Sequence, residues 1–310
     1  MAAHRTSSIG EGFYRSYRKL RYLSRRGTLL QQKKRPSLKS YQYPENTFTA
    51  IFVNSTFYSL LAYLIVSVLA QLVSSISALA FDIHTILYYD GTEYLIAAHK
   101  WSTDAVMTVF ITGPLTAFFL GILLFLLNLK IQDETGSLRL LIVWMIIHCI
   151  ILSIGDLLMG ALFNKGSGYV IMYLFFQDTG RMLIAFTAIT LLILLGFGLT
   201  RMFLLSGNIY FRELVEGNRI KFIINQFIIP YLVGSLILIL VIIPGITAYE
   251  VAKIASGILL LLPFMVRGYH YQDLYFDEDE KPLFFSLPAA VAALAGLVSF
   301  RIFFGRGIMI

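Results

Sequence analysis

Two ionisable residues lie inside one long apolar run of this chain, and they are its strongest candidates for chemistry. His148 and Asp156 occur in the stretch WMIIHCIILSIGDLLMGALFN. Ser153, Asp156 and Asn164 fall on roughly one face of a helix, with His148 about 80° around it from Asp156. Such residues suit a proton or ion relay or a ligand pocket. The alternative, which we favour, is that Asp156 bonds a neighbouring helix and His148 is a core histidine.

Two further pairs of opposite charge lie near the ends of apolar runs. Asp178 and Arg181 are three positions apart, and so are Glu250 and Lys253. Side chains at this spacing meet on a helix surface. We predict two interfacial ion pairs that anchor helix ends, rather than substrate clamps.

Catalytic signatures are missing from the sequence. The five histidines form no HExxH motif, no GxSxG or Walker lysine loop occurs, and Cys149 is the single cysteine. The chain therefore has no internal disulfide and no cysteine-based metal site. We predict no catalytic residue, no metal and no cofactor, and whether the chain is an enzyme stays open.

These residues must be positioned by long apolar segments. Hydrophobic residues make up 57% of the chain and charged residues 14%, against about 25% charged in soluble domains. Seven runs approach or exceed the roughly 20 residues that a membrane-spanning helix needs. They cover residues 51–79, 107–129, 140–163, 182–205, 222–243, 251–266 and 283–304. The sequence predicts an all-α polytopic membrane protein in contact with the lipid bilayer.

Two shorter elements are predicted between the spans. In the loop 81–104, residues rich in β-branched and aromatic types flank Asp90 and Gly91, a strong hairpin turn signal. We expect a short external β-hairpin there. Residues 166–176 are apolar but too short to cross, and we expect a re-entrant or interfacial half-helix.

Residues 1–50 form a basic leader, and residues 51–310 form the transmembrane bundle. The leader holds eleven Lys and Arg residues against two Glu. Phe13, Tyr17 and Leu20 recur in it at helical spacing, which predicts either an amphipathic helix on anionic lipid headgroups or a disordered basic arm. The basic residues around that pattern are Arg15, Arg18, Lys19, Arg21, Arg25 and Arg26. We expect no nucleic-acid partner.

Charge also predicts orientation. With seven spans, one side of the membrane carries nineteen Lys and Arg residues and the other carries six. The positive-inside rule places the richer side in the cytoplasm. We therefore expect a protein of the cytoplasmic membrane, with a cytoplasmic N-terminus and an external C-terminus.

Residues 84–129 resemble part of the site-2 family of intramembrane metalloproteases. A β segment is followed by a span that contains Gly113, Pro114 and Leu115, as in that family, and Asp156 falls near the place of the family's later aspartate ligand. The span before this segment holds no histidine and no glutamate. The resemblance therefore implies a relative without the zinc ligands or the general base.

Three functions remain open from the sequence. The first is a non-catalytic subunit or scaffold of a larger membrane assembly, with membrane-protein partners. The second is a small-molecule or ion transporter with a polar cavity around Asp156. The third is a catalytically inactive, site-2 protease-like membrane protein.

Overall fold

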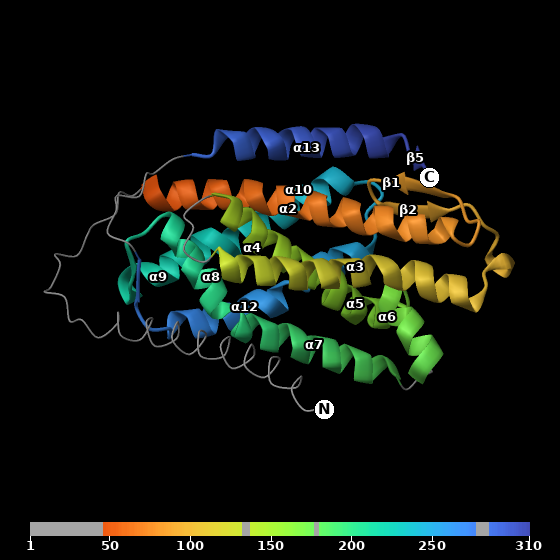
Figure 1. Ribbon diagram of the computed structural model, residues 1–310, viewed down its shortest axis with the longest axis horizontal. Helices are drawn as coiled ribbons and strands as arrows, with labels where there is room; N and C mark the ends of the chain where they lie inside the picture. The colour runs from red at the N-terminus through yellow and green to blue at the C-terminus, as the bar shows by residue number, and fades with distance from the viewer. Residues whose placement is uncertain (1–45, 132–136, 177–179, 277–284) are drawn as a thin grey trace, which may run out of the picture. The chain divides into compact units, whose positions relative to one another are not determined.

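The computed structural model describes residues 46–131, 137–176, 180–276 and 285–310 (Figure 1). The predictions for the leader, including its amphipathic helix and its six basic residues, lie outside the described residues. Asp178 lies outside them as well.

Among the described residues, seven helical segments are long and apolar enough to cross a bilayer, and each overlaps one of the seven predicted runs. The prediction of an all-α polytopic fold is confirmed, and the chain is a multi-pass membrane protein. The spans are α2 (Asn46–Leu79), α3 (Thr103–Lys130), α4 (Ser137–Ile150) to α5 (Asp156–Phe163), α7 (Gly180–Gly198), α9 (Glu216–Ile223) to α10 (Ile229–Ile242), α11 (Ala248–Ala255) to α12 (Ile258–Tyr269), and α13 (Leu287–Gly305).

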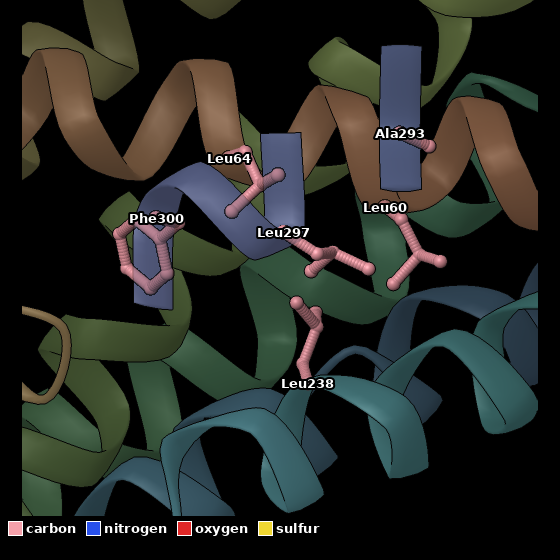
Figure 2. Close-up of a cluster of buried hydrophobic side chains, with 6 residues drawn as sticks. All are labelled: Leu60, Leu64, Leu238, Ala293, Leu297 and Phe300. Carbon is pink, nitrogen blue, oxygen red and sulfur yellow. The ribbon is translucent and has the colours of Figure 1, made fainter. Parts of the chain in front are cut away.

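The helix α2 lies at the centre of the packing. It contacts α3, α4, α10 and α13. Figure 2 shows one of these contacts, in which Leu60 and Leu64 of α2 meet Leu238 of α10 and three residues of α13. Those three are Ala293, Leu297 and Phe300. Many other buried positions of α2 are serine, threonine or alanine, and such small side chains let membrane helices approach closely.

Two spans are interrupted by π-helical turns. The turn η2 (Ile151–Gly155) joins α4 to α5, and η6 (Ile224–Ile228) joins α9 to α10. The second has a clear cause, because Pro230 has no N–H to offer the carbonyl four residues earlier. That carbonyl belongs to Gln226, and it accepts a hydrogen bond from the Ser55 hydroxyl of α2.

The predicted half-helix is present as α6 (Gly166–Ile171) and the π-helical turn η3 (Met172–Phe176), which packs back on α5 and α3. The chain reverses between α5 and α6 through Asn164 and Gly166, both of which have positive φ angles. Gly160 and Gly168 then meet at the crossing. A Cβ atom at Gly168 would lie 2.2 Å from the carbonyl oxygen of Leu157, so this approach requires glycine.

Short strands close both ends of the bundle. The predicted hairpin is confirmed as β1 (Thr85–Tyr88) and β2 (Gly91–Tyr94), with the turn one residue earlier than expected, at Tyr89 and Asp90. Not predicted was β5 (Ile308–Met309), which pairs with β1 and joins the end of α13 to the hairpin. At the other end, β3 (Glu213–Leu214) pairs with β4 (Leu274–Tyr275).

Aromatic packing holds the hairpin to the bundle. The Tyr94 ring lies 5.5 Å from the rings of both Trp101 and Phe110, centroid to centroid. Its burial raises the pKa of Tyr94 to about 12, because the charged phenolate would lose its hydration there. These ring contacts hold the hairpin against the beginning of α3.

We predict that Gly168→Ala destabilises the bundle, because the added methyl group would press on the backbone of α5. Overpacking of this kind costs about 1–3 kcal/mol, and thermal unfolding in detergent will show it as a lower melting temperature. The control is Gly198→Ala, where the added Cβ would meet no atom of another part of the chain within 4 Å. Equal melting temperatures for the two variants would contradict the close crossing of α5 and α6.

Candidate functional site

Asp156 is the centre of the candidate site. It is the first residue of α5, directly after the π-helical turn η2, and it is 5% exposed. π-Helical turns inside α-helices are frequent at functional sites. Here the turn changes the helical phase, so Asp156 no longer has the angular relation to His148 that a regular helix would give.

Four groups from two other segments converge on the Asp156 carboxylate. The backbone N–H and the hydroxyl of Ser167 both donate to Oδ2, at 3.2 and 2.6 Å. The Tyr249 hydroxyl donates to Oδ1, and the Lys253 ammonium lies 3.6 Å from the same oxygen. A carboxylate has about four lone-pair sites. The three hydrogen bonds occupy most of them, and the lysine places an opposite charge beside Oδ1.

The helix α11 presents Tyr249 and Lys253 together. Its first turn is fixed by Thr247, which exchanges hydrogen bonds with Glu250 in a capping box. Tyr249 and Lys253 are four positions apart and share one helix face, with the ammonium 4.9 Å from the phenol ring centroid. The ring and the carboxylate thus face the same cation.

This arrangement differs from the predicted ion pair between Glu250 and Lys253. The Glu250 carboxylate accepts bonds from Thr247, 2.8 Å from its backbone nitrogen, so it serves the helix end. Lys253 instead reaches the buried Asp156. An unpaired charge inside a span is costly. The ion pair between Asp156 and Lys253 compensates one charge on each of two spans.

The turn before α6 lets Ser167 approach the carboxylate. Gly166 has a φ of +57°, and a Cβ atom there would lie 2.5 Å from the Tyr249 hydroxyl oxygen and 3.1 Å from Asp156 Oδ2. Glycine is therefore required twice, for its backbone angle and for space. An added methyl group would press on the Tyr249 hydroxyl and the carboxylate at the point where they bond.

The other residues of the predicted polar face do not join Asp156. The Ser153 hydroxyl donates back to the Cys149 carbonyl of its own helix, at 2.7 Å, a frequent choice for serine inside helices. Asn164 accepts a hydrogen bond from Arg181 at 2.6 Å. Arg181 therefore ties α7 to the α5–α6 turn, and its predicted partner Asp178 lies outside the described residues.

His148 belongs to a second polar group, between α2 and α4. Its Nε2 atom lies 3.2 Å from the Ser59 hydroxyl, and its ring stacks on Trp144. One turn away, the Trp144 indole N–H donates to Ser55 at 2.8 Å. Both helices advance by four residues between these contacts, so they run in the same direction. These contacts match the interpretation of His148 as a core histidine.

The sequence reasoning missed Ser167 and Tyr249 as partners of Asp156, and Ser55, Ser59 and Trp144 as partners in the second group. The spacing of four between Tyr249 and Lys253 was a usable signal, and so was the same spacing in Ser55 with Ser59 and Trp144 with His148. The missing information was which helices are neighbours.

Comparison with known proteins finds no matching family model, no matching curated protein and no matching solved structure. In the described part of the chain, no three His, Cys, Asp or Glu side chains come together as a metal site would require.

We predict strong energetic coupling between Asp156 and Lys253. Lys253→Met alone leaves a buried carboxylate without its cation, which typically costs about 3–5 kcal/mol. The double variant Asp156→Asn/Lys253→Met removes both charges and should cost clearly less than the sum of the single variants. A double-mutant cycle measured by unfolding in mixed micelles tests this.

The matched control is Lys100→Met, the same substitution at an exposed lysine of the turn before α3. An exposed lysine needs no partner within the protein, so this substitution should change stability by no more than about 0.5 kcal/mol. Additive effects of Asp156→Asn and Lys253→Met would show that the two charges do not stabilise each other.

Proposed function

We propose that the chain is a non-catalytic subunit or scaffold of a larger membrane assembly, in which Asp156 is a structural brace. The observation that carries the proposal is that Ser167 and Tyr249 donate three hydrogen bonds to the Asp156 carboxylate and the Lys253 ammonium lies beside it. A substrate or ion would have to compete with these protein groups for the carboxylate. These contacts hold α5, α6 and α11 together, so the role of Asp156 is structural.

Transport is the second candidate, and one observation favours it. Asp156 and Lys253 are opposite charges on two different spans, and a π-helical turn directly precedes Asp156. Ionisable residues within spans often mark ion pathways, and an ion pair of this kind can act as a gate that opens. To open such a gate, the contact between Lys253 and Asp156 would have to break, and α5 would have to move relative to α4 at the π-helical turn η2.

The resemblance to site-2 proteases fits the scaffold proposal as an inactive relative. Gly113 of the Gly-Pro-Leu segment has a packing role here, because a Cβ atom there would lie 2.6 Å from the Ser74 hydroxyl oxygen of α2. The segment thus supports close packing of α2 and α3 without any catalytic group. We place the protein in the cytoplasmic membrane, with the basic leader facing anionic headgroups inside, on the charge bias of its loops.

We predict that the full chain, solubilised mildly from its native membrane, migrates on native gels as a complex. The same second protein should be found in that complex in every preparation. Deletion of residues 1–40 should release that partner while the chain stays in the membrane after carbonate extraction. A variant with the six basic residues of the leader changed to Gln separates charge from sequence, because it keeps the leader's length.

The scaffold and the transporter give different results for Asp156→Asn/Lys253→Met. A scaffold keeps the size and composition of its complex in this variant. A transporter keeps its membrane insertion but changes proton flux, measured in liposomes with an internal pH dye and an imposed pH gradient. A single uncomplexed species for every variant, together with a pH response lost in the double variant, would overturn the scaffold proposal.

A further inference from the structure

A groove opens on the membrane-facing side of the bundle between α10 and α13. The helix α13 packs mainly on α2, through the cluster in Figure 2, and touches α10 only lightly. The space left between α10 and α13 has a volume of about 310 Å³. Its lining consists of Leu240, Val241, Leu297, Val298, Arg301 and Ile302.

One cation lies in this otherwise apolar groove. Arg301 is four residues before the end of α13, which places it about 6 Å along the helix axis from that end. A phosphate group at the membrane surface is within reach from this depth, because arginine extends its charged group toward the interface.

The contacts of Arg301 hold its guanidinium without neutralising it. One N–H donates to the Val241 carbonyl at 3.0 Å, near the C-terminal end of α10. The guanidinium also lies 4.0 Å from the centroid of the Tyr89 ring in the hairpin turn. Among the described residues, no carboxylate forms an ion pair with it. A guanidinium has five N–H donors, so donors remain for an anion.

We propose that this groove is a binding site for an anionic glycerophospholipid. The lipid phosphate pairs with Arg301 beside Tyr89, and one acyl chain lies along Leu297, Val298 and Ile302. Charge complementarity favours an anionic headgroup, because Arg301 places one positive charge in the span and no acidic residue of the described chain lines the groove. The apolar wall selects the tail.

The size and position of the groove fit a lipid rather than other occupants. The groove is open and about 310 Å³ in volume, which suits a flexible acyl chain lying along its wall. A free phosphate would contact Arg301 but leave the apolar wall unused. The wall faces outward, with Val298 57% and Ile302 51% exposed, so lipid reaches it directly.

The test compares lipid retention by full-length protein in nanodiscs of equimolar phosphatidylcholine and phosphatidylglycerol with matched acyl chains. Native mass spectrometry of the released protein should show one retained phosphatidylglycerol molecule on the wild type. Arg301→Gln should weaken that retention about tenfold, as expected for a charge-assisted hydrogen bond. The control Arg306→Gln, an exposed arginine just after α13, should leave it unchanged.

A second pair of variants tests the tail site and keeps Arg301 in place. Val298→Phe fills the groove and should reduce lipid retention, whereas Val291→Phe should not, although both valines are 57% exposed on the same helix. Free phosphate added at excess should not displace the lipid. Equal retention in wild type, Arg301→Gln and Val298→Phe, or equal retention of both lipid types, would overturn the proposal.

Discussion

The packing of this bundle is organised around the buried Asp156 carboxylate, whose hydrogen bonds and ion pair all come from other segments of the chain. Lipid offers no hydrogen bonds and little stabilisation of charge. A carboxylate inside a span must therefore find its partners within the protein. Ser167 and Tyr249 donate hydrogen bonds to it and Lys253 neutralises it. These partners fix where α6 and α11 lie against α5.

The same constraint explains the polar contacts along α2. Because Pro230 has no N–H, the Gln226 carbonyl lacks its usual helical donor and accepts a hydrogen bond from the Ser55 hydroxyl instead. The same hydroxyl accepts a hydrogen bond from the Trp144 indole. Near the break between α11 and α12, the Ile254 carbonyl accepts a bond from Tyr231. At both of these departures from a regular helix, a side chain from a neighbouring span bonds the carbonyl. The hydroxyl-rich face of α2 is therefore part of the hydrogen bonding as well as of the packing.

The features set by local sequence could be predicted. Span positions follow from the length of each apolar run, and the hairpin follows from Asp90 and Gly91 between β-prone residues. The short helix at residues 166–176 was predicted because it is apolar yet too short to cross. Each of these depends on properties of one contiguous segment, which a single sequence displays directly.

The features set by helix neighbours could not be predicted. Lys253 was assigned to Glu250 because they are close in sequence, whereas the fold brings it to Asp156 on another span. The π-helical turn before Asp156 altered the helical phase on which the face containing Ser153 was based. The pairing of β5 with β1 involves only two residues of β5, too few for a pattern. Spacings of four, as in Tyr249 with Lys253, identify a shared face but not the helix that it meets.

The protein closes the Asp156 carboxylate off from water, and the accessibility of introduced cysteines tests this closure. Cys149 is the only native cysteine, so Cys149→Ala provides a background for Ser167→Cys, next to the carboxylate, and Lys165→Cys, on the exposed turn before it. A charged, membrane-impermeant thiol reagent applied to open membranes should label residue 165 rapidly and leave residue 167 unlabelled. Labelling of both positions at similar rates would mean that water reaches Asp156, and the structural brace would have to be given up in favour of an open site.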